Sequence, residues 1–205
     1  MFTGLIQELG TVIRVQRSKG LIRLGLEAPK TAARVQRLDS VAVNGVCLSV
    51  VGCDERTMAF EVIQETARLT TLSTVRCGNR VNLELSLGMS DRLGGQILFG
   101  HVDGVGTIVQ RRERPGGVAL TVRLASSMRK FVVPKGPIAV DGVSLTVGEV
   151  LTSATFAVHL IPETLRQTTL RFLAVRDRVN LEVDYLAKLV WQFTRRQDRV
   201  AGGPH

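Results

Sequence analysis

The sequence predicts an all-β protein: two copies of one small antiparallel barrel or sandwich, followed by a single amphipathic helix. Three observations support this class. Similar phrases recur in the same order about one domain length apart. Apolar and polar residues alternate with a period of two through much of the chain, as they do in half-buried strands. Gly, Asp and Asn interrupt the alternation about every ten residues, as turns between short strands do.

The internal repeat is the strongest of these observations. The clearest pairs are VNGVCLSV (Val43–Val50) with VDGVSLTV (Val140–Val147), IQETARLTTL (Ile63–Leu72) with IPETLRQTTL (Ile161–Leu170), and NRVNLE (Asn79–Glu84) with DRVNLE (Asp177–Glu182). A fainter echo relates Gly4 and Gly10-Thr11 to Gly100 and Gly106-Thr107. The units of a solenoid run about 20 to 50 residues. The paired phrases lie farther apart than that, so their spacing indicates a duplicated domain. We expect domains at residues 1–96 and 97–184, joined near Asp91–Phe99.

Strands are predicted where the alternation is cleanest: Thr11–Gln16, Ile22–Glu27, Ala119–Leu124, Phe156–Leu160 and Val179–Val183. Short helices are predicted at Pro29–Val35, Ser126–Phe131 and Thr164–Thr169.

The C-terminal segment has a different period. Leu186, Leu189, Val190 and Phe193 recur at helical spacing, which predicts an amphipathic helix over 185–197 and a flexible tail over 198–205. Such a helix either covers the mouth of its own barrel or meets a partner chain. We favour the partner, and with it an oligomer.

Composition narrows the class of function. The chain has 205 residues and a net charge of +9, but its charges are scattered and aromatic residues make up only 4%, so it lacks the stacking platforms of nucleic-acid-binding barrels. We expect no nucleic-acid partner. The N-terminus does not resemble an export signal, and no apolar run is long enough to span a membrane. The three cysteines suggest neither a disulfide framework nor a zinc site. A cytoplasmic location with no membrane contact is expected.

Differences between the two copies indicate where chemistry could occur. Cys47 becomes Ser144 while its neighbours are retained, and each stands one valine after an Asn-Gly or Asp-Gly turn. Both positions could simply hold small buried side chains; alternatively, a thiol and a hydroxyl at barrel rims could meet ligands. His101 stands where the first copy has Leu5, and His is suited to proton transfer near neutral pH. The sequence contains no motif typical of a hydrolase nucleophile and no glycine-rich phosphate-binding loop. Its histidines and cysteines also lack the paired spacing of metal ligands, so no metal site is expected.

Taken together, the motifs resemble one known family. MFTGLIQELGTV, VNGVCLSV, ET followed by TTL, FGHVDGVGTI, VDGVSLTV, HLIPETLRQTTL and VNLEVDYLAKLV are similar to the alpha-type riboflavin synthases, with their duplicated lumazine-binding domain. The resemblance runs from Met1 to about Phe193. It implies two six-stranded antiparallel Greek-key barrels in tandem and a C-terminal helix that assembles a homotrimer.

The resemblance also implies an activity. Riboflavin synthases are transferases that dismutate two molecules of 6,7-dimethyl-8-ribityllumazine, moving a four-carbon unit from one to the other, and release riboflavin and 5-amino-6-ribitylaminouracil as the last step of riboflavin biosynthesis. No cofactor is expected. The active site is expected between the N-barrel of one chain and the C-barrel of a neighbour, and association with lumazine synthase is a further expected partnership.

Site residues carry over by motif, as expectations. The catalytic candidates are Cys47, His101 and Ser144, supported by Ser40, Asp141 and Asp184. Substrate contacts of the N-barrel are expected at Gly4, Leu5, Ile6, Cys47, Leu48, Ser49, Glu61, Val62, Ile63, Gln64, Glu65 and Thr66. Those of the C-barrel are expected at Gly100, His101, Val102, Lys135, Val143, Ser144, Leu145, His159, Leu160, Ile161, Pro162, Glu163 and Thr164.

Two departures from the family pattern stand out: Gln96 replaces an expected His, and Ser49 replaces a Thr. Gln cannot carry a proton as His does, whereas Ser keeps the hydroxyl. The alternative function is a non-catalytic antenna-type protein that binds lumazine or flavin without turnover. We favour the enzyme because both copies keep their motifs.

Overall fold

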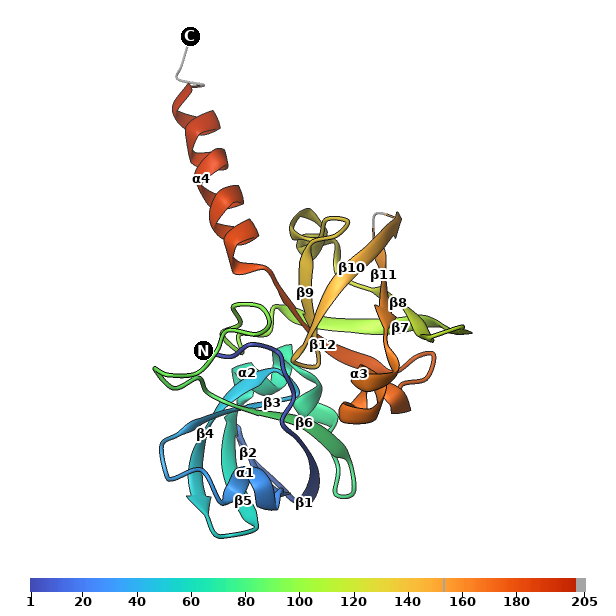
Figure 1. Ribbon diagram of the computed structural model, residues 1–205. Coiled ribbons are helices and arrows are strands. Elements are labelled where there is room, and N and C mark those ends of the chain that lie inside the picture. Colours follow the sequence, from blue (N-terminus) through green and yellow to red (C-terminus); the bar gives the residue numbers. More distant parts are fainter. Residues whose placement is uncertain (153, 202–205) are drawn as a thin grey trace.

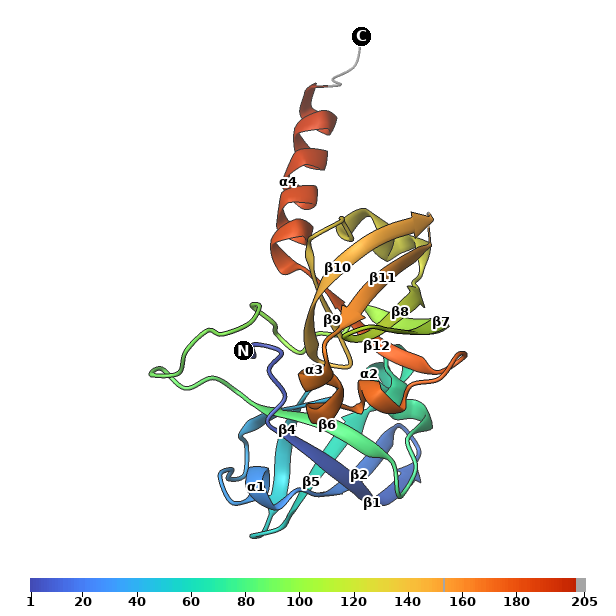
Figure 2. The same ribbon diagram turned by 45° about the vertical axis from the view of Figure 1, so that its right-hand side comes forward.

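The computed structural model describes residues 1–152 and 154–201, and the side chains of the terminal helix up to Arg195. It contains two barrels, one above the other in Figure 1, with the last helix projecting away from both. Figure 2, turned by 45°, shows the same arrangement. No helix in the described ranges is both long and apolar enough to cross a bilayer.

The first barrel is closed by six antiparallel strands: β1 (Glu8–Ser18), β2 (Leu21–Glu27), β3 (Ser40–Val43), β4 (Val46–Cys53), β5 (Thr57–Ile63) and β6 (Arg80–Leu85). Their order around the barrel is β1-β2-β5-β4-β3-β6. Three hairpin-connected strands, β3 to β5, are followed in space by β2, which is the Greek-key arrangement. Predicted strands Thr11–Gln16 and Ile22–Glu27 lie within β1 and β2.

The second barrel repeats this topology with β7 (Gly104–Arg114), β8 (Gly117–Arg123), β9 (Pro137–Val140), β10 (Val143–Thr152), β11 (Thr155–Leu160) and β12 (Arg178–Val183). The order β10-β11-β8-β7-β12-β9 is the same cycle as in the first barrel. The strands predicted at Phe156–Leu160 and Val179–Val183 are confirmed, and the strand predicted at Ala119–Leu124 is confirmed up to Arg123. The duplication read from the sequence is therefore a duplication of the fold.

Each barrel has its own apolar core, because alternate residues of every strand point inward. Phe60 fills the first core and Phe156 the second, and both are fully buried. A small third cluster joins the two barrels: Phe2, Ala42, Leu98 and Ala139. The two barrels are thus joined by apolar packing as well as by the chain between them.

The short helices differ somewhat from prediction. α1 is only Pro29–Ala32, and the segment Ser126–Phe131 forms a 3₁₀ helix. The helix expected at Thr164–Thr169 is α3, Pro162–Gln167, because Thr168 is extended and its hydroxyl caps the following 3₁₀ turn. Its counterpart α2, Gln64–Leu69, was not predicted.

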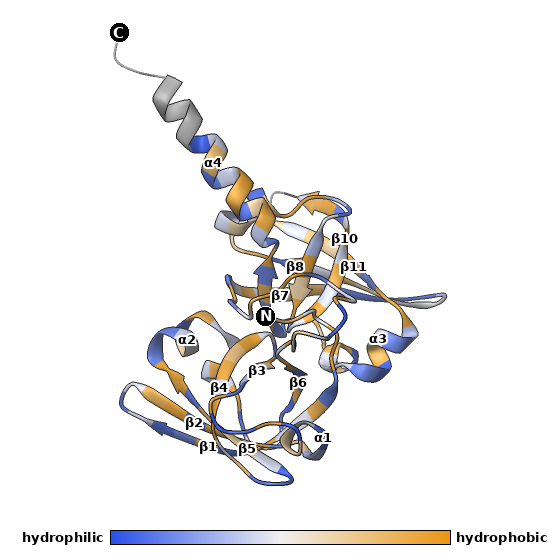
Figure 3. Cartoon of the chain, turned by 60° about the vertical axis from the view of Figure 1, so that its left-hand side comes forward, coloured by the Kyte–Doolittle hydropathy of each residue, from blue (hydrophilic) through white to orange (hydrophobic). Residues whose placement is uncertain are grey.

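The C-terminal helix α4 spans Tyr185–Ala201, so the predicted end at 197 was too early. Residues 202–205 of the predicted tail lie outside the described residues. Figure 3 shows hydrophobic residues along α4 where it leaves the barrels. Leu186, Val190 and Phe193 are each at least 60% exposed. Trp191 of α4 contacts Phe131 of the second barrel edge-on at 5.7 Å, but Leu186, Val190 and Phe193 are left largely uncovered by the barrels of the chain.

Candidate functional site

The two barrels meet at their repeated turns. Asn44-Gly45 and Asp141-Gly142 all have positive φ, the conformation that Asn, Asp and Gly adopt most readily. A Cβ on Gly45 would lie 2.7 Å from the backbone nitrogen of Gly142, and one on Gly142 would lie 2.6 Å from that of Gly45. The turns therefore pack backbone against backbone, about an approximate two-fold axis between the copies.

Two buried asparagines fix this contact. The Asn82 amide donates to the Asp141 carbonyl at 2.9 Å and accepts from the Thr169 backbone N–H at 2.8 Å. Asn180 makes the mirrored pair, donating to the Asn44 carbonyl and accepting from the Thr71 N–H, both at 2.8 Å. These residues were missed as functional positions, although their identity within NRVNLE and DRVNLE was the available signal.

The segment that precedes each barrel crosses to the other barrel. The Gly4 carbonyl accepts a hydrogen bond from the backbone N–H of Ser144 in the C-barrel, and the Gly100 carbonyl accepts one from the N–H of Cys47 in the N-barrel, each at 2.9 Å. Ile6 accordingly packs on the second core and Val102 on the first. Each candidate pocket is therefore built from both copies.

This crossing corrects one expectation. We assigned Gly4, Leu5 and Ile6 to the N-barrel pocket and Gly100, His101 and Val102 to the C-barrel pocket. The hydrogen bonds place them the other way round: 4–6 lies with Ser144, and 100–102 lies with Cys47. Position in a repeat shows equivalence between copies, but it does not show which barrel a segment docks on.

Two buried glutamates anchor the crossing segments to their own barrels. Glu84 on β6 accepts hydrogen bonds from the N–H groups of Thr3 and Gly4, at 2.6 and 2.9 Å. Glu182 on β12 accepts from Phe99 and Gly100, at 2.8 and 3.1 Å. Burial raises the pKa of both carboxyls, while these hydrogen bonds oppose the rise. Glu84 and Glu182 thus hold Gly4 and Gly100 against the opposite barrel.

The thiol and the hydroxyl occupy equivalent places. Cys47 lies on β4 opposite Ala42, and Ser144 lies on β10 opposite Ala139. Both are half-buried, so neither is only a core side chain. Ser40 on β3 lies opposite Ser49 on β4, and this pair is on the same face of the sheet as Ala42 and Cys47.

His101 follows Gly100, whose carbonyl accepts the hydrogen bond from Cys47, and the residues on either side of it contact the start of α4. Its ring stacks on Phe99 with a centroid separation of 5.9 Å, and Phe99 meets Tyr185 edge-on at 4.9 Å. Asp103 forms an ion pair with Lys188 of α4 at 2.7 Å and accepts a hydrogen bond from the N–H of Val183. The His101 segment is thereby held between β12 and the start of α4.

The remaining predicted residues fall into three groups. The first group lies where a strand passes into a short helix, at equivalent places in the two copies. In the first copy, where β5 leads into α2, these residues are Glu61, Gln64, Glu65 and Thr66. In the second copy, where β11 leads into α3, they are His159, Pro162, Glu163 and Thr164. Val62 and Leu160 are buried in the cores, whereas Ile63 and Ile161 are 59% and 61% exposed. Leu48, Val143 and Leu145 are buried on β4 and β10, and Lys135 has a positive φ before β9.

Three predicted polar groups have structural partners that explain them. The Asp184 carboxylate accepts from the Leu186 N–H at the start of α4, as a helix cap does. The Asp141 carboxylate accepts from the Asn180 N–H in the contact between barrels. Gln96 donates to the Leu145 carbonyl at 2.7 Å, so this side chain acts as a hydrogen-bond donor to β10. Cys47, Cys53 and Cys77 are free thiols, and the described residues contain no group of His, Cys, Asp and Glu side chains suited to a metal ion.

Gly100 offers a direct test of the crossing contact. A Cβ there would lie 2.6 Å from the Cβ of Cys47, at a φ of +71°. We expect Gly100→Ala to lower the free energy of unfolding by about 3 kcal/mol, from strain and overpacking together, and to impair the N-barrel pocket. Gly20→Ala is the matched control, since Gly20 has a φ of +82° but no atom within 4 Å of the added carbon. Urea unfolding should show a loss near 1 kcal/mol there. Equal losses would mean that the crossing contact is not tight.

Comparison with known proteins decides the family. A model of the lumazine-binding domain matches the chain twice, at residues 3–86 and 99–184. The riboflavin synthase of Chlamydia pneumoniae is 42% identical over 190 residues, covering 92% of each chain. That of Mycobacterium bovis is 41% identical over 198 residues, covering 95% of this chain and 98% of the relative. This chain belongs to the riboflavin synthase family. It is accordingly an enzyme, as the sequence motifs predicted.

Solved structures agree on the fold. LumP complexed with riboflavin superposes with a TM-score of 0.83 at 24% identity, covering 89% of this chain and 99% of that one. LumP complexed with 6,7-dimethyl-8-(1'-D-ribityl) lumazine gives a TM-score of 0.81 at the same identity. At this identity the likeness concerns the fold alone. The curated relatives favour the riboflavin synthases over an antenna-type protein.

Proposed function

We propose that the chain catalyses the dismutation of two 6,7-dimethyl-8-ribityllumazine molecules into riboflavin and 5-amino-6-ribitylaminouracil. One lumazine loses a four-carbon unit and the other gains it. The two products contain all the atoms of the two substrates, and the acceptor ring is oxidised as the donor is broken down. No external oxidant, reductant or further substrate enters the balance.

The observation that carries this proposal is the pair of equivalent half-sites. Each combines one barrel's β4 or β10 with the crossing segment of the other copy, and the two differ at a nucleophilic position, Cys47 against Ser144. A reaction between two copies of one substrate needs two similar sites. The two substrates have different roles, so the sites must also differ.

His101 is the base in this proposal. It would remove a proton from the ring methyl of one lumazine, while Cys47 or Ser144 supplies or activates a nucleophile at the ring carbon that carries a methyl. Orientation of two rings against each other could supply several kcal/mol of the acceleration. The hydrogen bond between Gly100, next to His101, and Cys47 supports a proton transfer from the substrate of the N-barrel in this proposal.

Exposed apolar groups support a site shared between chains. Ile63 lies at the end of β5 and Ile161 directly after β11, and they are 59% and 61% exposed. Leu5 is 51% exposed. Side chains of α4 are exposed to a similar extent. Such surfaces are usual where a partner covers them. We infer a cytoplasmic homotrimer in which the N-barrel of one chain faces the C-barrel of the next; association with lumazine synthase stays a prediction.

The proposal is tested by incubating the purified protein with the lumazine alone and following flavin absorbance. One riboflavin should appear for every two lumazine molecules consumed, with no added cofactor. Tight binding of the lumazine without any flavin would overturn the proposal and favour an antenna-type protein.

Cys47→Ser separates thiol chemistry from packing. The same strand position holds Ser144 in the other barrel, so a hydroxyl fits there. We expect the turnover number to fall about tenfold or more without vanishing, and the free energy of unfolding to change by less than about 1 kcal/mol. Steady-state kinetics and urea unfolding measure the two effects. Wild-type turnover in this variant would exclude the thiol from the reaction.

A further inference from the structure

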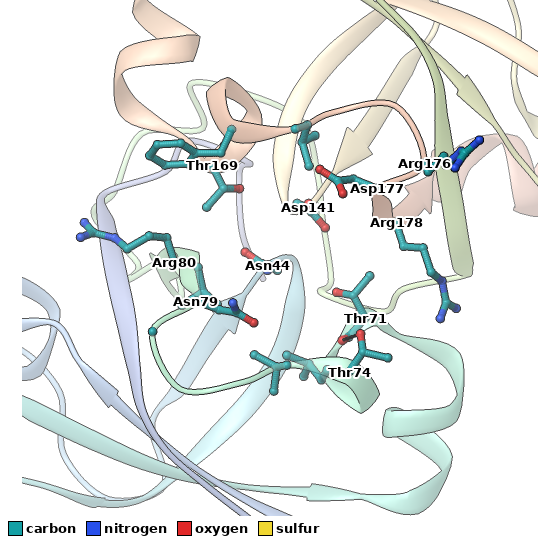
Figure 4. Close-up of a pocket in the computed structure, with 16 residues that line it drawn as sticks. Asn44, Thr71, Thr74, Asn79, Arg80, Asp141, Thr169, Arg176, Asp177 and Arg178 are labelled. Atoms are coloured by element: carbon teal, nitrogen blue, oxygen red, sulfur yellow. Dashed lines mark hydrogen bonds between the residues drawn. The ribbon is translucent and has the colours of Figure 1, made fainter.

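A cavity of about 560 Å³ lies between the barrels on the approximate two-fold axis. Its size falls within the range of small-molecule sites, about 300 to 1,000 Å³. Figure 4 shows Asn44, Asp141, Asp177 and Thr169 gathered around its centre, with Arg80, Arg176 and Arg178 toward its edge. Its lining includes Asp141 but not Cys47, His101 or Ser144. It is therefore separate from both candidate half-sites.

The Thr169 hydroxyl points to a ligand. Thr169 is 93% buried, since only 7% of its surface is exposed, and it lines the cavity. Within the described part of the chain its Oγ1 has no hydrogen-bond partner. A buried hydroxyl without a partner costs about 1 to 3 kcal/mol. In this structure Oγ1 itself has less than 1 Å² of accessible surface. A ligand hydroxyl or phosphate oxygen would reach it only with a shift of the Thr169 side chain, and would then remove this cost, because a threonine hydroxyl can both donate and accept.

The cavity has donors on one side and acceptors on the other. Asn44 uses its Oδ1 to accept from the Asn82 N–H, and Asn79 uses its Oδ1 to accept from the Arg76 N–H. Their NH₂ groups stay available as donors. At the equivalent positions of the second copy, Asp141 and Asp177 each engage one carboxylate oxygen with a backbone N–H. The second oxygen of each stays available as an acceptor. Donors that face acceptors across a cavity suit the hydroxyls of a polyol, because a hydroxyl can both donate and accept.

The rim adds positive charge. Arg80, Arg176 and Arg178 border the cavity, against the two carboxylates of Asp141 and Asp177. Arg80 is partly engaged, since it donates to the Leu9 carbonyl at 3.1 Å. Guanidinium groups bind phosphate with two parallel hydrogen bonds. The polar centre and the arginine rim together match a molecule with hydroxyls at one end and a phosphate at the other.

We propose that this cavity binds a polyhydroxylated phosphate ester of the sugar phosphate class. The hydroxyls lie against Thr169, Asn44 and Asp141, and the phosphate lies against the guanidinium of Arg178 or Arg176. Because the walls come from both barrels, the ligand also holds the barrels together. The site does not depend on the dismutation activity, since its own binding can be measured without turnover.

Isothermal titration of the full chain with ribose 5-phosphate tests the proposal. Saturable binding is expected for the wild type. Thr169→Val should weaken it about fivefold or more through one lost hydrogen bond, and Arg178→Gln at least as much. Arg112→Gln removes the same charge outside the cavity lining and should leave the affinity within twofold. Ribitol and inorganic phosphate, which carry the two halves of the chemistry separately, should each bind more weakly.

The ligand-free variants supply a second test. The Thr169 hydroxyl of the wild type has no partner among the described residues, so its removal in Thr169→Val should leave the melting temperature at the wild-type value or raise it. The variant should also keep wild-type turnover of the lumazine. The proposal is overturned if ribose 5-phosphate shows no saturable binding, or if its affinity is the same in wild type, Thr169→Val and Arg178→Gln. It is also overturned if the lumazine displaces the sugar phosphate competitively, because that would place the binding in the half-sites.

Discussion

Asp141→Asn is expected to stabilise the protein above pH 7 by up to about 4 kcal/mol. Burial raises the pKa of Asp141 from 3.8 to about 7, and each pKa unit corresponds to about 1.4 kcal/mol. Between these values the folded state binds more protons than the unfolded state. The protonated Asp141 of the wild type therefore contributes its full share to the free energy of unfolding below pH 4, and this share is lost as the pH rises through 7. The variant, which has no titrating group there, should lack the fall.

The first copy provides the matched control for this variant. Asn44 occupies the equivalent turn, and its Oδ1 accepts from the Asn82 N–H at 2.7 Å just as Asp141 accepts from Asn180 at 2.8 Å. Asn44→Asp should therefore introduce a second fall in stability with rising pH, smaller because Asn44 is only half-buried. Urea unfolding from pH 4 to 8 measures both. Superimposable pH profiles for wild type and Asp141→Asn would contradict the effect. Retained turnover would show that Asp141 serves the barrel contact rather than catalysis.

His101→Ala is expected to lower the turnover number by about 10²- to 10⁴-fold, the usual worth of a general base. KM should change much less, because in the proposed site the barrel and the crossing backbone also contact the substrate. Since the ring is solvent-exposed and contacts Phe99, its removal should cost little stability.

Ser144→Ala completes this test. The Ser144 backbone N–H keeps its bond to Gly4 in the variant, so only the hydroxyl is removed. A large fall in turnover at either position supports a direct role for that side chain. Unchanged rates in both His101→Ala and Ser144→Ala would remove the proposed chemistry from these residues.

Much of the fold could be predicted from the sequence because its signals are local. Alternation located strands such as Ile22–Glu27, and the repeated phrases located equivalent turns. Short helices were harder. α2 has only one and a half turns and no side-chain cap, so Gln64–Leu69 carries little helical signal of its own. At the C-terminus, the helical structure of α4 continues through Ala201, past the end predicted from the apolar spacing.

The site was only half predictable, because its assembly depends on long-range hydrogen bonds. Cys47, Ser144 and His101 stood out as differences between copies. Their grouping did not, since it depends on Glu84 and Glu182 directing residues 4 and 100 across the two-fold axis. The cavity at the axis could not be predicted either. Its walls come from both barrels, and long-range contacts such as the hydrogen bonds of Asn82 and Asn180 hold those walls together.

The claim that each chain offers two ligand sites is tested most directly by stoichiometry. Titration with an unreactive lumazine analogue that lacks the ring methyl groups should saturate at two equivalents per chain, one on the Cys47 barrel and one on the Ser144 barrel. Saturation at a single equivalent would contradict the account, because two lumazine molecules could not then be held together for the transfer.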